Sequence, residues 1–300
     1  MKKITITGDF PFTDGQKARL AAVGEVKIAT DYSSAEEWLS TVQGSDVILS
    51  DGDYLYENLE NLENVFVTYP YIELGTFDSE KLKAKGVYVA NAQGGNRNSI
   101  VEWVVFAVLS LFRKFPTYLR TTVNHEFARH SSLEGKKVLI IGKGSIGTMV
   151  GEALEALKME VVYFVRGDDL KMKSKDVDLV VNALNCNSSS KNLLNEDFFM
   201  SLSPGSYYVT FARPYTYDID GVIKSINSGI LAGAGIDCDP ELLFDTTNAF
   251  YQKCLKNEKI LVTPHVAGIT KEAGVNGREI AIQNIEAYLS GKPQNILTKV

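Results

Sequence analysis

Three glycines in one short stretch form the strongest chemical signal in the sequence. An apolar run at residues 138–141 leads into Gly-x-Gly-x-x-Gly, and a helix-like segment at 148–157 follows. The first glycine permits a tight turn, the second lets backbone N–H groups approach a pyrophosphate, and the third lets the helix pack closely on the strand. The pattern predicts a dinucleotide-binding turn, although a purely structural glycine-rich turn would look the same. The residues of this turn are Gly142, Lys143, Gly144, Ser145, Ile146 and Gly147.

The residues after the next strand bear on the choice between the two nicotinamide cofactors. A turn built for NAD usually places Asp or Glu there, where the carboxylate accepts from the ribose 2′-hydroxyl. In this chain the strand ends at Val165 and is followed by Arg166. A guanidinium suits the 2′-phosphate of NADP, so the sequence favours NADP. Two alternatives stay open, namely NAD itself and Arg166 as a solvated loop cation.

One histidine occupies a position suited to proton transfer. His265 directly follows the apolar segment 260–263, and the carboxyl ends of parallel strands are where such folds place their sites. Histidine also exchanges protons near neutral pH. His125 and His130 lie in a polar connecting segment and are expected at the surface. Position alone leaves a structural role for His265 equally open.

Strand-like and helix-like segments alternate along most of the chain, a pattern typical of βαβ units and parallel sheets. The first series of strands is expected at 3–7, 26–29, 47–50, 65–69 and 87–91. After a long helix at about 99–115, a second series is expected at 137–141, 160–165, 179–183, 207–211, 233–236 and 260–263. An amphipathic helix at 278–289 ends the pattern, and the Asn-Ser-Ser-Ser cluster at 187–190 is expected to be an ordinary loop. The sequence therefore predicts two doubly wound parallel-sheet α/β domains.

Composition argues against several classes of protein. The 300 residues are 45% hydrophobic and 23% charged with a net charge of -6, which predicts a globular protein without a nucleic-acid or membrane partner. The most apolar stretch, 100–112, is too short to span a bilayer, and the first residues lack the apolar core of a signal peptide. Cys186, Cys238 and Cys254 show no CxxC spacing, so we expect no disulfide framework, no metal site and a reducing, cytoplasmic location.

Several spaced motifs resemble those of the D-isomer-specific 2-hydroxyacid dehydrogenases, which include lactate, glycerate, phosphoglycerate and glyoxylate/hydroxypyruvate enzymes. The likeness runs from about Asn91 to Leu297, and more faintly over the first 90 residues. The motifs that carry it are Asn98-Ser99-Ile100-Val101-Glu102, Leu133-Glu134-Gly135-Lys136, Pro204-Gly205, Thr210-Phe211-Ala212-Arg213, the segment 228–237 and Thr263-Pro264-His265.

The resemblance implies the reversible reduction of a 2-oxo acid to a D-2-hydroxy acid with NADP(H) or NAD(H). Arg213 would bind the substrate carboxylate and polarise the 2-oxo group, and His265 would donate a proton to that oxygen. The further cofactor contacts that it implies are Leu184 and Asn185 near the adenosine, and Phe211, Ala212 and Asp237 at the nicotinamide.

The resemblance also implies a domain organisation. A Rossmann-type NAD(P)-binding domain at 97–269 would be inserted into a flavodoxin-like substrate domain made of 1–96 and 270–300, with the site in the cleft between them. Members of the family are commonly dimers through the cofactor domain, so we expect a homodimer whose other partner is a small molecule.

The sequence departs from the family pattern beside both catalytic residues. The family pairs its histidine with a glutamate, whose charge raises the histidine pKa. The matching position here is Leu242, so Glu241 is the candidate and Asp239 the fallback. Pro214 follows the arginine where the family has glycine, which fixes φ and removes an N–H group.

A third departure concerns the substrate domain. The family has a glycine-rich turn whose N–H groups hold the substrate carboxylate, whereas this chain reads Tyr71-Ile72-Glu73-Leu74. Glu73 would repel an acid if it pointed inward, so we expect it to point outward or to meet a cation. The tyrosines favour a bulkier or less anionic ligand. This departure and the altered glutamate leave open a dehydrogenase for a different carbonyl substrate, and a non-catalytic NAD(P)-binding regulator of this fold is a separate alternative.

Overall fold

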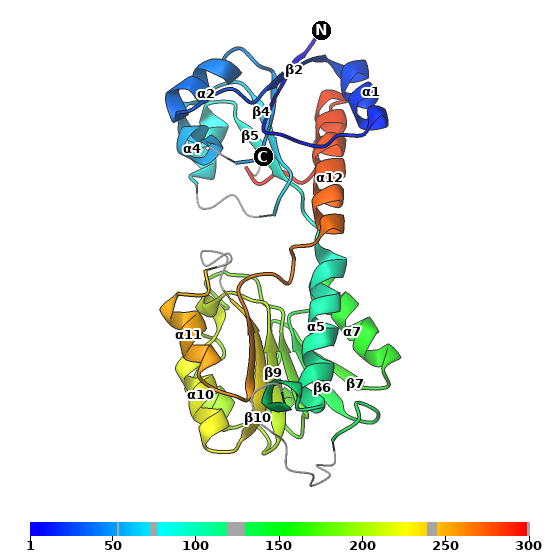
Figure 1. The fold of residues 1–300 in the computed structure, drawn as a ribbon, viewed down its shortest axis with the longest axis vertical. Helices are drawn as coiled ribbons and strands as arrows, with labels where there is room; N and C mark the ends of the chain where they lie inside the picture. Colours follow the sequence, from blue (N-terminus) through cyan, green and yellow to red (C-terminus); the bar gives the residue numbers. More distant parts are fainter. Residues whose placement is uncertain (53, 73–76, 119–129, 239–244, 299–300) are drawn as a thin grey trace. The chain divides into compact units, whose positions relative to one another are not determined.

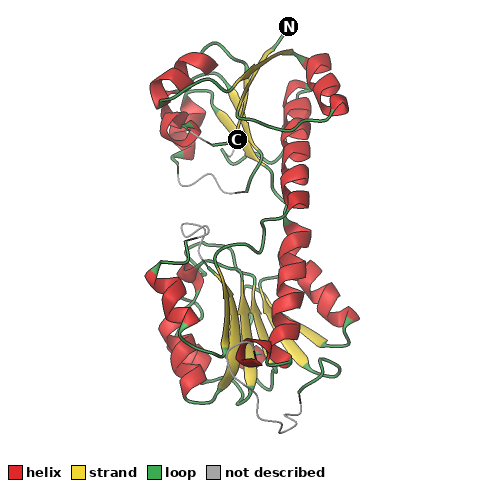
Figure 2. Cartoon of the chain, in the orientation of Figure 1, coloured by secondary structure: helices red, strands yellow, loops and turns green. Residues whose placement is uncertain are grey.

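The chain forms two compact α/β units in a computed structural model that describes residues 1–52, 54–72, 77–118, 130–238 and 245–298. Unit 1 consists of residues 1–96 and 270–300, and unit 2 of residues 97–269. Each unit is a parallel sheet with helices packed on it (Figure 1, Figure 2), which confirms the predicted fold class. Within the described ranges, none of the helices combines the length and the apolar character needed to cross a bilayer.

Unit 1 contains a five-stranded sheet in the order β2-β1-β3-β4-β5, the flavodoxin-like order. Its strands are β1 (Lys3–Thr7), β2 (Glu25–Ala29), β3 (Val47–Ser50), β4 (Phe66–Tyr69) and β5 (Tyr88–Asn91). Its helices are α1 (Asp14–Val23), α2 (Ala35–Val42), α3 (Leu55–Asn58), the 3-10 turn η1 (Leu59–Asn61), α4 (Ser79–Ala84) and α12 (Lys271–Leu289).

The strands of unit 1 bury side chains on both faces of the sheet. Ile48 and Val67 pack with Trp38 of α2 on one face. Leu49 packs with Ile282 of α12 on the other face. Because successive strand residues point to opposite faces, a sheet covered on both sides needs strands that are apolar throughout.

Helix α12 begins earlier than the sequence pattern predicts. We expect a helix over 278–289, but α12 spans Lys271–Leu289 and is capped by Thr270, whose hydroxyl accepts from the Ala273 N–H at 3.1 Å. Glycines lower helix propensity and so hide this first part of the helix. Gly277 is needed there because a Cβ atom would lie 2.0 Å from the Pro70 carbonyl oxygen. Close packing against Pro70 therefore requires a glycine in the first half of α12, and the Thr270 cap marks where the helix begins.

Unit 2 contains a six-stranded parallel sheet in the order β11-β10-β9-β8-β6-β7. Its strands are β6 (Lys137–Ile141), β7 (Glu160–Phe164), β8 (Leu179–Asn182), β9 (Ser206–Thr210), β10 (Leu231–Asp237) and β11 (Ile260–Thr263). Its helices are α5 (Arg97–Phe112), α6 (Phe115–Tyr118), α7 (Ser145–Ala156), α8 (Leu170–Lys173), α9 (Glu196–Met200), the 3-10 turn η2 (Pro214–Thr216), α10 (Ile219–Asn227) and α11 (Ala249–Leu255).

The long helix predicted at about 99–115 is divided in two. Helix α5 ends at Phe112, and α6 begins at Phe115. Lys114 has a φ of 53°, in the left-handed region that cannot continue a right-handed helix. The prediction of one continuous helix was wrong, although Pro116, in the first turn of α6, is a local signal for the break because proline cannot sit inside a continuing helix.

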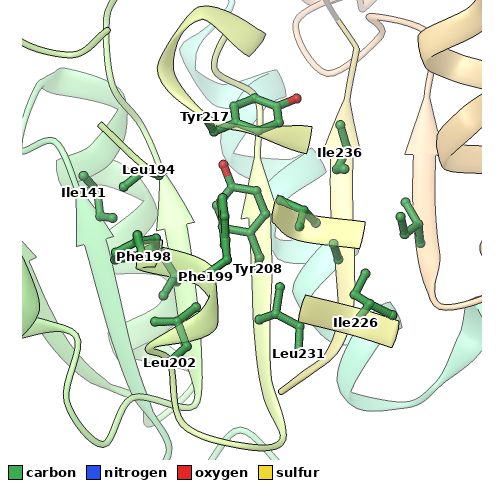
Figure 3. Close-up of a cluster of buried hydrophobic side chains, with 14 of the residues drawn as sticks. Ile141, Leu194, Phe198, Phe199, Leu202, Tyr208, Tyr217, Ile226, Leu231 and Ile236 are labelled. Atoms are coloured by element: carbon green, nitrogen blue, oxygen red, sulfur yellow. The ribbon is translucent and has the colours of Figure 1, made fainter. Parts of the chain in front are cut away.

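One face of the unit 2 sheet carries an aromatic cluster (Figure 3), which also contacts a buried amide. The Tyr208 ring packs edge-to-face against Phe199, with 5.0 Å between the ring centroids. Its centroid lies 5.8 Å from that of the Tyr217 ring. The side-chain amide of Asn182 donates to the Tyr208 hydroxyl at 3.1 Å and to Thr216 Oγ1 at 3.0 Å. These bonds satisfy the buried polar groups and fix the carboxyl end of β8.

The contact between α1 and α12 yields a test of stability in unit 1. The guanidinium of Arg19 donates to both Glu286 oxygens at 2.8 and 2.7 Å and to Glu279 at 2.6 Å. Because the Arg19 side chain is 37% exposed, solvent screens these bonds. We expect Arg19→Ala to lower the free energy of unfolding by about 1 kcal/mol in urea titrations at low salt, and by less at high salt.

A more exposed ion pair provides the control for this experiment. Lys81 pairs with Glu60 at the surface, and Lys81→Ala should leave the unfolding free energy unchanged. The guanidinium of Arg19 lowers the pKa of Glu279. A carboxyl group whose pKa is lowered by folding stabilises the fold only while it is ionised. The effect of Arg19→Ala should therefore shrink as the pH falls through the Glu279 pKa, and an equal effect of both variants would contradict the interpretation.

Candidate functional site

The candidate catalytic residues of unit 2 lie beyond neighbouring strands at one edge of the sheet. In the register of the sheet, Thr210 at the end of β9 pairs with Ile236, and Asp237 at the end of β10 pairs with Thr263. Arg213 follows β9, and His265 follows β11. Because neighbouring strands lie about 4.8 Å apart, the carboxyl ends of β9 and β11 are about 10 Å apart. The fold therefore brings to one edge two residues that lie far apart in the sequence.

The turn that carries His265 is held by a buried carboxylate. Asp237 is 4% exposed, and its carboxylate accepts from the Thr263 hydroxyl and from the backbone N–H groups of Val266 and Ala267, both at 2.9 Å. Burial raises the pKa of Asp237, and these hydrogen bonds act in the opposite direction. His265 itself has a φ of 56°, in the left-handed region, where a non-glycine residue is strained. The hydrogen bonds to Asp237 hold His265 in this conformation.

The His265 ring has a main-chain partner. Nδ1 lies 2.9 Å from the carbonyl oxygen of Cys238, which can only accept a hydrogen bond. This contact therefore favours the tautomer that carries its proton on Nδ1. In that tautomer Nε2 is the ring atom that takes up and releases a proton.

Arg213 occupies the N-terminal cap of the short turn η2. Its carbonyl oxygen accepts from the Thr216 N–H at 3.0 Å, and Pro214 is the first residue of the turn. A proline at that position has no N–H group to leave unpaired, and its fixed φ suits the turn. The departure from the family at Pro214 is thus accommodated by local structure.

The glycine turn between β6 and α7 has the geometry needed for a diphosphate. Gly142 has a φ of 107°, and a Cβ atom on Gly147 would lie 2.0 Å from the Gly142 carbonyl oxygen. A Cβ atom on Gly144, in contrast, would meet no described atom within 4 Å. Open space thus lies before the first turn of α7, whose N–H groups attract anions. These residues fit the pyrophosphate of a dinucleotide.

Helix α7 begins at Ser145, three residues before the start predicted from the sequence. Gly144 is its N-terminal cap residue, so Ser145, Ile146 and Gly147 form the first turn of the helix. The predicted boundary was wrong because the glycines mask a helix start that packing fixes. Lys143 lies exposed beside the turn, with its Nζ 4.8 Å from the centre of the Tyr163 ring.

Arg166 lies exposed just beyond β7, at the same edge of the sheet. Its Nη2 donates to the Ser189 hydroxyl at 3.0 Å. The carboxylate nearest in sequence, Asp168, accepts instead from the Val165 N–H at 3.0 Å and lies 3.7 Å from Lys173. Leu184 is half-buried and Asn185 exposed in the loop after β8. The sequence gives no signal for this contact of Ser189, because a cluster of small polar residues has the composition of any loop.

Fewer of the substrate-domain candidates can be described. The Tyr71 ring lies edge-on to Tyr69 with 5.0 Å between the centroids, and the Ile72 carbonyl accepts from the Asn91 side chain at 2.6 Å. His130 is exposed, and its Nε2 lies 3.2 Å from the Tyr118 hydroxyl. Candidates that lie outside the described residues are Glu73, Leu74, His125, Asp239 and Glu241.

Known structures share this fold over nearly the whole chain. The D-mandelate dehydrogenase of Rhodotorula graminis superposes with a TM-score of 0.83 at 19% identity, covering 100% of this chain and 98% of that one. An acyclic imino acid reductase, solved with NADPH and D-Arg, superposes with a TM-score of 0.79 at 20% identity, covering 98% and 99%. These likenesses establish the fold.

Sequence comparison is more specific. A D-3-phosphoglycerate dehydrogenase of Haemophilus influenzae is 31% identical over 223 residues, which cover 68% of this chain and 54% of that enzyme. The chain spans little more than half the length of the first curated relatives that it matches. Residues 105–267 match the family model described as the NAD binding domain of D-isomer specific 2-hydroxyacid dehydrogenases. Because that match covers more than half of the chain, the protein belongs to the D-isomer specific 2-hydroxyacid dehydrogenase family.

Proposed function

We propose that the protein reversibly reduces a 2-oxo acid to a D-2-hydroxy acid, with NADP(H) as the preferred cofactor. The observation that carries the proposal is the placement of His265. Asp237 and the Cys238 carbonyl hold the imidazole in a strained turn at the sheet edge that also carries Arg213. Membership in the family supports the same reaction.

In the proposed mechanism Arg213 and His265 have separate tasks. Arg213 binds the substrate carboxylate through its planar fork of N–H groups and polarises the 2-oxo group. His265 donates the Nε2 proton to the 2-oxo oxygen during reduction and removes it during oxidation. The nicotinamide, when bound, supplies or accepts the hydride. We assign Glu241 as the carboxylate that tunes His265.

The cofactor is assigned to the carboxyl edge of the unit 2 sheet. The turn from Gly142 to Gly147 would hold the pyrophosphate. Asp237 can also accept from the nicotinamide carboxamide, because each carboxylate oxygen accepts more than one hydrogen bond. The remaining contacts assigned to the cofactor are Val165, Arg166, Leu184, Asn185, Phe211 and Ala212.

The proposed substrate contacts in unit 1 follow β4. We assign Tyr71, Ile72, Glu73 and Leu74 to this role, in addition to Arg213 of unit 2. The exposed ring of Tyr71 offers an apolar surface to the substrate side chain.

The preference for NADP rests on the surroundings of Arg166. The guanidinium lies at the position where NAD-dependent turns carry an acid, and Asp168 is engaged by Val165 and Lys173. A positive group there favours the 2′-phosphate of NADP over the 2′-hydroxyl of NAD.

We also propose a homodimer in a reducing, cytoplasmic environment. Phe106 and Leu109 of α5 are 50% and 39% exposed, and Phe115 of α6 is 44% exposed, an apolar surface that a second copy would cover. The three cysteines are thiols rather than disulfides, which fits a reducing compartment.

The acid/base role of His265 can be tested by its removal. We expect His265→Ala to lower kcat by about 10²- to 10⁴-fold, the usual contribution of a positioned acid/base group, without changing the Kd of the cofactor. The measurement is steady-state turnover of a panel of 2-oxo acids and neutral ketones with NADPH or NADH. His130→Ala is the matched control and should keep full activity.

The same panel separates the alternatives. Unchanged turnover by His265→Ala would refute the assignment of the acid/base group. Turnover of neutral ketones alone would favour a different carbonyl substrate. Cofactor binding by the parent protein without turnover of any substrate would favour a regulator of this fold.

Two glycines of the cofactor turn should respond differently to the same added methyl group. Gly144→Ala enters open space and should leave Tm unchanged, yet weaken cofactor binding at least tenfold because the Cβ atom occupies the pyrophosphate position. Gly147→Ala clashes with the Gly142 carbonyl and should lower Tm by several degrees. Calorimetry and fluorescence titration with NADPH measure both effects. Tight NADPH binding by Gly144→Ala would contradict the assignment.

The proposed cofactor preference predicts a selective loss on removal of Arg166. Arg166→Ala should raise the Kd for NADPH about tenfold or more and leave that for NADH within about twofold, because only NADPH carries the 2′-phosphate. Lys171→Ala, which removes a nearby exposed cation, is the control. An equal loss for both nucleotides would rule out recognition of the 2′-phosphate.

A further inference from the structure

Arg166 and Ser189 form a hydrogen bond at the carboxyl edge of the unit 2 sheet, the edge to which the dinucleotide is assigned. In the sheet, β6 lies between β7 and β8. Arg166 follows β7, and Ser189 lies in the loop after β8. Their hydrogen bond of 3.0 Å therefore spans the carboxyl end of β6, where the glycine turn begins. Ligands of doubly wound sheets bind at such a point, because neighbouring connections there leave in opposite directions.

Hydrogen bonds within its own loop hold Ser189 in place. The side-chain oxygen of Asn187 accepts from the Ser189 N–H at 3.0 Å and from the Ser189 hydroxyl at 2.6 Å. The buried Ser190 hydroxyl accepts from the Asn187 N–H at 3.0 Å and lies 2.7 Å from the Asn185 carbonyl oxygen. The Ser189 hydroxyl accepts from Arg166, and it can rotate its single proton from Asn187 toward an incoming acceptor.

The charges around this pair favour an anion. Over the part of the chain that the structure describes, no carboxylate lies within ion-pair distance of the Arg166 guanidinium. Asp168 points instead to the Val165 N–H and to Lys173. Arg166 and Ser189 thus present several N–H donors and one O–H donor side by side, both on exposed residues. A phosphate dianion accepts from donors of both kinds.

We propose that Ser189 is a specificity-determining residue, whose hydroxyl binds the 2′-phosphate of NADP(H) together with the Arg166 guanidinium. The proposal rests on the cofactor preference proposed above and adds a second donor from a separate loop. The two donors come from the loops that follow β7 and β8, so the sheet fixes the spacing between them. This spacing, as well as the charge of Arg166, selects the phosphate. A 2′-hydroxyl is uncharged and offers a single oxygen, so it binds this pair of donors more weakly than a phosphate does.

Binding of adenine nucleotides without nicotinamide tests Ser189 independently of turnover. The probes are 2′,5′-ADP, which carries the 2′-phosphate, and 5′-ADP, which lacks it, titrated into the full chain by calorimetry. Ser189→Ala should weaken 2′,5′-ADP about fivefold or more and leave 5′-ADP within about twofold, because a hydrogen bond to a charged group is lost. Ser188→Ala, a change of the neighbouring exposed serine, should alter neither, and Ser189→Thr should restore the discrimination.

Each other outcome overturns the proposal in a distinguishable way. If Ser189→Ala weakens both probes equally, the serine only orders its loop. If the parent protein prefers 2′,5′-ADP but Ser189→Ala keeps that preference, Arg166 recognises the phosphate without Ser189. If the parent protein binds the two probes equally, the NADP preference and the role of Ser189 both fail, while the dehydrogenase proposal stands on its own test of turnover.

Discussion

The hydrogen bonds that the buried Asp237 carboxylate accepts from the turn after β11 are the constraint on which the candidate site depends. They hold a non-glycine residue, His265, at a φ of 56° and leave its Nδ1 against the Cys238 carbonyl. Without a fixed acceptor, backbone strain of this kind relaxes, and the imidazole loses both its tautomer and its direction. Asp237 is therefore structural whether or not it also touches the cofactor.

The same parallel sheet explains why the remaining candidates lie near one another. Strands that run in one direction present all their carboxyl ends at one edge, so residues that follow them converge without any contact in sequence. At that edge the turn before α7 offers N–H groups for an anion, and the loop after β9 presents Arg213. The buried amide of Asn182 ties β8 to β9 and η2 directly below this edge.

In unit 1 the decisive contacts are close backbone approaches. Helix α12 covers one face of the sheet with Ile282 and Ile285, and it can do so only because Gly277 has no side chain facing Pro70. The charged side chains of Arg19, Glu279 and Glu286 line the join between α1 and α12. Apolar burial accounts for the stability of this layer, and the ion pairs fix its alignment.

Local patterns in the sequence determined the fold class, the order of the strands along the chain and the glycine turn, because apolar strand runs and turn glycines act over a few residues. His265 became a candidate through its position after an apolar strand, and the family resemblance strengthened it, whereas Arg213 became a candidate only through that resemblance. The tertiary structure alone decided the early start of α12, the Cys238 carbonyl as partner of His265 and the hydrogen bond between Arg166 and Ser189. Each depends on atoms from distant segments or on a backbone conformation that propensity does not encode, and a single sequence carries no local signal for such contacts.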